Sequence, residues 1–201
     1  MAPASFLRSW IAWVTAGEAA GFAVPAVVGA LSAGADTVLA VPGLLLAGAV
    51  EGAILGTAQV HVLRKAIPAL SSEWWIAATS AAAIVSYTLG ILPSTLASSV
   101  SGLWLAAIAV ACGLLLLLTM GTAQWIVLRH HVARAGRWIA ITAVGWLAGL
   151  AVFLLIATPL WHQGQQLWLT VAIGVLAGLF MAAAVAVITG FGMRALLNIR
   201  A

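Results

Sequence analysis

Charged residues are scarce in this chain. Its 201 residues include eight Lys and Arg and four Asp and Glu, so that 6% of the residues are charged and 65% are hydrophobic. A soluble domain usually carries about 25% charged residues. So few charges cannot cover a water-soluble body, which excludes an ordinary soluble domain and a disordered chain. The single cysteine, Cys112, excludes a disulfide scaffold.

Enzyme motifs are also missing. The sequence has no GxSxG, HExxH, CxxC or Walker sequence and no GxGxxG in a strand-turn-helix setting. Its loops are too short for a soluble catalytic domain. We therefore expect no enzymatic activity, no cofactor and no metal. His130 and His131 lie among arginines, as in a solvated loop, and the alternative is a metal-binding or pH-sensing role together with His61.

Six apolar stretches are long enough to cross a bilayer. A hydrocarbon core of about 30 Å needs about 20 apolar residues per helix. The stretches are continuously apolar, without the alternation of a barrel strand, and Pro93 and Pro159 are expected to end two of the helices. The sequence thus predicts one all-α integral membrane domain over residues 1–201, with spans at 10–30, 38–63, 74–92, 102–128, 138–158 and 167–192.

The basic residues all fall on one side of these six spans. The opposite loops, 31–37, 93–101 and 159–166, contain no Lys or Arg. By the positive-inside rule both termini are cytoplasmic, and we expect a multi-pass protein of a bacterial plasma (inner) membrane. The lipid bilayer then accounts for the net charge of +4, and no nucleic-acid partner is expected because no basic-aromatic module accompanies the charge. The basic residues are Arg8, Arg64, Lys65, Arg129, Arg134, Arg137, Arg194 and Arg200.

Tryptophans gather near the ends of the spans, where amphipathic rings prefer the headgroup layer. Only Trp146 is predicted to lie deep. We interpret the others as interfacial: Trp10, Trp13, Trp74, Trp75, Trp125 and Trp138 near the cytoplasmic ends, and Trp104, Trp161 and Trp168 near the outer ends.

A two-helix unit occurs three times. Gly-Thr-Ala-Gln stands at 56–59 and again at 121–124, each time followed by Val-Leu-Arg, and Trp-Ile-Ala stands at 10–12, 75–77 and 138–140. An even number of spans per unit gives every copy the same orientation. We therefore expect a parallel pseudo-threefold bundle with a period of about 65 residues, made of units 8–65, 73–130 and 137–194.

The repeated element, a Gly with Gln three residues later and Leu-Arg after a further three, resembles a pattern in bacterial multi-span membrane proteins that carry no assigned function. Through its repetition the likeness covers most of the chain. It implies a multi-span fold, and no activity or catalytic residue.

Small residues form stripes on the first two spans. Gly17 and Gly21 mark one stripe, and Gly48, Gly52 and Gly56 another. Small residues let membrane helices approach closely, and we expect these two stripes to face each other.

The repeated polar residues lie near the cytoplasmic ends of the spans. Gln59 lies in the arc of the second glycine stripe, so its amide is predicted to bond across the interface. Gln59 and Gln124 can also cap backbone carbonyls, while Arg64, Arg129 and Arg194 extend to lipid headgroups. The alternative for these residues is a binding site for headgroups or an anionic substrate.

Two acids distinguish the first unit. At about 1.5 Å per residue, Glu18 lies about 12 Å and Glu51 about 20 Å below the cytoplasmic boundary. An ionised carboxylate at such depth normally faces the bundle interior, finds a partner or stays protonated. We predict a proton or cation site here; the alternative is a neutral glutamate that bonds a backbone carbonyl or Thr15 and only joins helices. The other units have Ala83 and Trp146 in place of Glu18, and Leu116 and Met181 in place of Glu51.

Three functions fit these features. The first is a small transporter or channel whose ion- or substrate-binding residues are Glu18, Glu51, Gln59 and Gln124. The second is a non-catalytic subunit that assembles with protein partners in a larger membrane complex. The third is a lipid- or pigment-binding protein that uses its small-residue grooves and tryptophans. We rank transport first.

Overall fold

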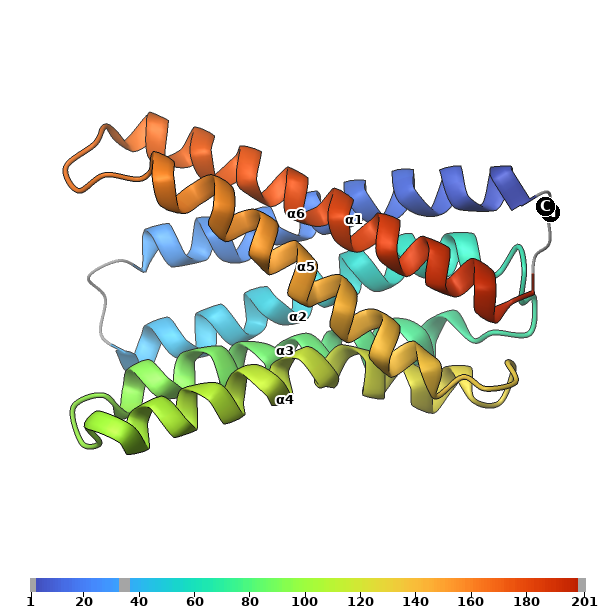
Figure 1. Cartoon of the computed structure of the whole chain (residues 1–201), viewed down its shortest axis with the longest axis horizontal. Coiled ribbons are helices and arrows are strands. Elements are labelled where there is room, and N and C mark those ends of the chain that lie inside the picture. Colours follow the sequence, from blue (N-terminus) through green and yellow to red (C-terminus); the bar gives the residue numbers. More distant parts are fainter. Residues whose placement is uncertain (1–2, 33–36, 199–201) are drawn as a thin grey trace.

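The computed structural model describes residues 3–32 and 37–198, and this part of the chain is all-helical. Its six helices are long and apolar enough to cross a membrane, which confirms the predicted helical class. Because successive helices alternate in direction, both ends of the chain lie at the same end of the bundle (Figure 1). The helices are α1 (Pro3–Leu31), α2 (Thr37–Leu63), α3 (Ser72–Leu96), α4 (Gly102–Leu128), α5 (Arg137–Leu160) and α6 (Leu167–Leu196).

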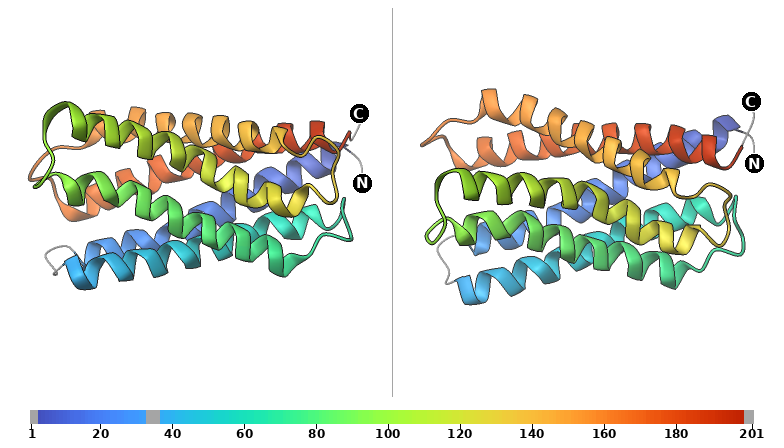
Figure 2. Two further views of the ribbon diagram at one scale, coloured as in Figure 1. Left: turned by 90° about the horizontal axis from the view of Figure 1, so that it is seen from below. Right: turned by 60° about the horizontal axis from the view of Figure 1, so that its bottom comes forward.

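The helices form a closed ring. Each helix contacts its neighbours in the chain, and α6 also contacts α1. The α1–α6 contact joins the two ends of the sequence and closes the ring, as the two views of Figure 2 show. Side chains from all six helices therefore meet in a common interior.

Two predicted helix ends are wrong. Pro93 lies inside α3, which continues to Leu96, and Pro159 lies inside α5, which continues to Leu160. A proline removes a single backbone donor, and near a helix end side chains can satisfy the freed carbonyls. In the last turn of α3 the hydroxyls of Ser94 and Thr95 donate to the carbonyl oxygens of Ile91 and Leu92, whereas the carbonyl that lacks a donor because of Pro93 is that of Leu89.

The hydrophobic core lies at the end of the bundle that holds both termini. Trp10, Trp75 and Trp138 are completely buried in it, and the rings of Trp10 and Trp138 meet edge to face with centroids 6.1 Å apart. Their interpretation as interfacial tryptophans is wrong. Indoles are tolerated inside because each N–H finds a side-chain acceptor there.

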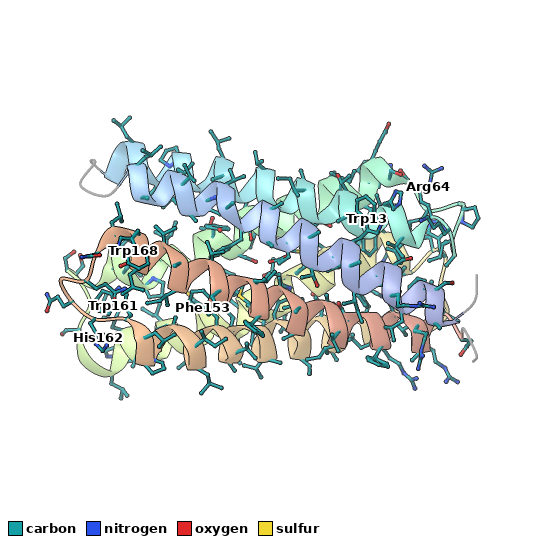
Figure 3. All side chains as sticks on the ribbon, turned by 90° about the horizontal axis from the view of Figure 1, so that it is seen from above. Trp13, Arg64, Phe153, Trp161, His162 and Trp168 are labelled. Atoms are coloured by element: carbon teal, nitrogen blue, oxygen red, sulfur yellow. The ribbon has the colours of Figure 1, made fainter. Side chains whose placement is uncertain are left out.

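The two ends of the bundle differ in charge. Figure 3 shows Trp13 and Arg64 at one end and Trp161, His162 and Trp168 at the other. The described Lys and Arg all lie near the end that holds the termini and the α2–α3 and α4–α5 loops, which we call the basic end. Arg200 and residues 33–36 of the first outer loop lie outside the described residues.

Glycines bring α1, α2 and α3 into close contact, but not as expected. A Cβ on Gly52 would lie 2.7 Å from the Cα of Ser80 in α3, whereas a Cβ on Gly21 would lie 3.1 Å from the carbonyl oxygen of Glu51 in α2. The two glycine stripes therefore serve different interfaces and do not face each other. The stripe on α1 faces α2, and the stripe on α2 faces α3.

We expect Gly52→Ala to lower the free energy of unfolding by on the order of 1–3 kcal/mol, because backbone atoms of α3 must move to admit the methyl group. Gly113→Ala is the matched control, since a Cβ at Gly113 meets nothing within 4 Å. It should raise stability by about 0.5–1 kcal/mol. Unfolding in mixed detergent micelles measures both, and equal stability of Gly52→Ala and the wild type would contradict the close α2–α3 packing.

Candidate functional site

A cavity of about 360 Å³ lies inside the ring, and all six helices contribute to its wall. This volume is at the lower end of the range of about 300–1,000 Å³ for small-molecule sites. The wall is mostly apolar, and its hydrogen-bonding side chains are Glu51, Ser86, Tyr87 and Trp146. The cavity is therefore suited to a small apolar molecule with one polar group.

Aromatic contacts between α1 and α5 lie on both sides of the cavity. On α5, the cavity-lining residues Trp146 and Leu150 lie between Trp138, which contacts Trp10, and Phe153, which contacts Phe22 with ring centroids 6.4 Å apart. The two helices flank α6 in the ring, so these contacts join α1 to α5 across the interior on either side of the cavity.

One carboxyl group stands in the cavity wall. Glu51 of α2 is 7% exposed, and the hydroxyl of Tyr87 in α3 donates to its Oε2 at 2.6 Å. Gly48 leaves room for the Tyr87 ring, since a Cβ there would lie 2.6 Å from the Cδ2 of Tyr87. Tyr87 was not predicted from the sequence as a site residue. The feature that could have drawn attention to it is that it is the only tyrosine in the chain.

Glu18 lies beside Glu51, and its side chain is completely buried. Within the described residues, neither carboxyl oxygen of Glu18 has a hydrogen-bond partner, and the same holds for Oγ1 of Thr15. The backbone of Gly21, one turn after Glu18 on α1, packs on the backbone and side chain of Glu51. The structure thus brings the two acids together, without the bond to Thr15 or to a carbonyl that a purely structural role would supply.

Gln59 and Gln124 form a separate polar cluster nearer the basic end, and neither lines the cavity. The Nε2 of Gln124 donates to Oε1 of Gln59 at 2.7 Å and to Oγ1 of Thr79 at 3.1 Å. Trp75 donates to Gln59 at 3.2 Å, and Trp138 donates to Gln124 at 2.9 Å. Both amides bond across helix interfaces, as predicted for Gln59, and their partners are side chains rather than backbone carbonyls.

The three repeated arginines lie at the basic end, away from the cavity. The guanidinium of Arg129 lies 5.3 Å from the Trp125 ring centroid and that of Arg194 lies 5.2 Å from that of Phe191, while Arg64 donates to the Ser72 hydroxyl at 3.4 Å. Among the described residues, no three His, Cys, Asp or Glu are grouped as a metal site would require.

Comparison of the chain with protein-family models, with curated proteins and with solved structures finds no match. The function is therefore inferred from the cavity and its side chains.

We expect Gln124→Met to destabilise the protein and Glu18→Met not to do so. Replacing an unbonded buried carboxyl with an apolar chain of similar length should leave stability unchanged or raise it, because a desolvation penalty disappears. Gln124→Met should cost about 1–3 kcal/mol or more, since it leaves the indole N–H of Trp138 unsatisfied. Thermal unfolding in detergent measures both; a strongly destabilised Glu18→Met would show that Glu18 has a bonded structural role.

Proposed function

We propose that this protein is a multi-pass membrane carrier that binds a small organic cation in its central cavity and moves it across the bilayer. The observation that carries the proposal is the composition of the cavity wall, in which one carboxyl group stands among aromatic rings. No chemical conversion of the cation is part of the proposal.

The membrane placement rests on the surface of the bundle. Large apolar side chains are exposed on all six helices, among them Leu39, Leu103, Leu155 and Val175, and a soluble monomer rarely exposes apolar patches of this extent. The basic residues gather at one end, as they do on the cytoplasmic side of bacterial membrane proteins. We infer a plasma membrane location with the basic end in the cytoplasm.

A triplicated hairpin explains the similar roles of residues spaced by 65 positions. Glu51, Leu116 and Met181 all line the cavity. The same type of bond joins each hairpin to the next one around the ring, with an indole N–H donating to a polar side chain. Trp75 of α3 donates to Gln59 of α2, Trp138 of α5 to Gln124 of α4, and Trp10 of α1 to Thr189 of α6. These repeated relations support three units around a pseudo-threefold axis.

The choice of an organic cation follows from the side chains around Glu51. The carboxylate supplies a counter-charge, and the rings of Phe22, Tyr87 and Trp146 also line the cavity. Aromatic faces attract quaternary ammonium groups by about 0.5–2 kcal/mol each. The remaining wall is apolar and favours a ligand with a hydrophobic body.

A carrier fits this interior better than an open channel does. Toward the basic end, the interior is filled by Trp10, Trp75 and Trp138 and by the bonded glutamines. A permanent pore needs a continuous water-filled path. Access from the basic end therefore requires a second conformation in which this aromatic cluster opens.

The binding test compares two probes of nearly equal shape. Benzyltrimethylammonium carries a fixed positive charge, and neopentylbenzene is its neutral analogue. We expect the purified protein in nanodiscs to bind the cation, and Glu51→Gln to weaken that binding at least about tenfold, corresponding to about 1.4 kcal/mol. Binding of neopentylbenzene should change little, and proteoliposomes should take up the radiolabelled cation only when Glu51 is present.

Glu73→Gln is the matched control, because Glu73 is an exposed acid at the start of α3. This variant should bind and transport like the wild type. Equal binding of the cation by the wild type and Glu51→Gln would refute the site, and binding without uptake would refute the carrier.

The orientation is tested by cysteine labelling on a Cys112→Ser background. Ser99 and His131 are exposed and lie at opposite ends of the bundle. An impermeant maleimide should label Ser99→Cys in intact cells, and should label His131→Cys only after the membrane is permeabilised. Labelling of both positions from the same side would contradict the proposed topology.

A further inference from the structure

Glu18 is the one acid of the described residues that is buried without a hydrogen-bond partner. It is completely buried, and both of its carboxyl oxygens lack a partner. Glu51 accepts a bond from Tyr87, and the buried glutamines and the threonines on α3, α5 and α6 are hydrogen-bonded. In the described part of the chain, the other buried polar side-chain atom without a partner is Oγ1 of Thr15, one turn before Glu18 on α1.

No positive charge faces Glu18 from the helices packed around it. The ionisable residues of α2 are Glu51 and His61, and His61 lies ten residues nearer the basic end, against the ring of Trp13. The only ionisable residue of α6 is Arg194, at the basic end, and Arg8 of α1 lies ten residues before Glu18. An ionised carboxylate without a donor or counter-charge is strongly disfavoured in an apolar interior. In this conformation Glu18 therefore holds a proton.

The position of Glu18 couples this proton to the cavity. Gly21 packs against Glu51 and holds α1 close to α2 there, so a cation at Glu51 comes near both carboxyl groups. A nearby positive charge favours the ionised form of a carboxyl group. The carboxylate of Glu51 disfavours ionisation of Glu18 by repulsion, and a cation bound at Glu51 cancels this repulsion.

We propose that Glu18 is a proton-binding site that releases its proton when an organic cation binds at Glu51, so that the carrier exchanges a cation for a proton. The inference rests on the proposed function. In the step, the cation pairs with the Glu51 carboxylate, the O–H bond of Glu18 breaks, the electron pair stays on the carboxylate and the proton leaves to water. One positive charge enters and one leaves, so the net charge of the interior is unchanged.

The test measures protons released on binding of benzyltrimethylammonium, by calorimetry in buffers of different ionisation enthalpy. We expect the wild type to release up to about one proton per cation at neutral pH. Glu18→Gln should bind the cation within about threefold of wild-type affinity and release almost none. Proton release that persists in Glu18→Gln would assign the proton to Glu51 and overturn the proposal.

The outcomes separate the two proposals. Binding by the wild type without proton release would overturn the exchange and leave the cation site standing. Absence of cation binding would overturn both.

A second measurement needs no ligand. Infrared spectroscopy detects the carbonyl band of a protonated carboxyl group, and at neutral pH this band should be present in the wild type and reduced in Glu18→Gln. Thermal unfolding checks that Glu18→Gln is folded, which is expected because Gln matches a neutral Glu in shape. A band of equal intensity in a folded Glu18→Gln variant would show that Glu18 is ionised and would overturn the proposal.

Discussion

The buried amides, indoles and most buried hydroxyls of this bundle lie among apolar side chains and bond one another. Gln124 of α4 shows how these bonds organise the ring, since its amide bonds Gln59 of α2, Thr79 of α3 and Trp138 of α5. One side chain thus joins four helices. An unsatisfied amide in an apolar interior is costly, and the same bonds that avoid this cost fix the positions of the helices at the basic end.

The cavity lies beyond the hydrogen-bonded cluster, on the side away from the basic end. Toward the basic end, large tryptophans and paired amides fill the interior. Farther along the helices, the residues that line the interior include Gly52, Ala83 and Gly90 beside larger side chains, and together they leave a cavity of about 360 Å³. The first hairpin adds Glu51 and Glu18 at this level. The acids at this level thus come from α1 and α2 alone among the described helices.

Much of the fold could be predicted from the sequence, and the errors have identifiable causes. The number of apolar helices and their approximate ends could be predicted from the lengths of the apolar stretches. The burial of Trp10, Trp75 and Trp138 could not be predicted in this way. An indole near a helix end can bond a lipid headgroup or a glutamine side chain, and which of the two it bonds depends on the neighbouring helix. The glycine stripes were recognised, but the prediction that they face each other was wrong. The spacing of small residues shows which side of a helix they occupy and not which neighbouring helix packs on that side. Pro93 was expected to end its helix, but a proline removes only one backbone donor, and α3 continues for another turn to Leu96.

The candidate site was also only partly predictable from the sequence. By itself the sequence determined that Glu18 and Glu51 lie deep in apolar helices, because depth depends only on helical rise and on the position of each residue in its own span. Only the tertiary structure decided that Tyr87 bonds Glu51, that Glu18 has no hydrogen-bond partner among the described residues and that all six helices line one cavity. These features depend on side chains from helices far apart in the chain, whose rotation about their own axes is set by packing against neighbours and not by local sequence.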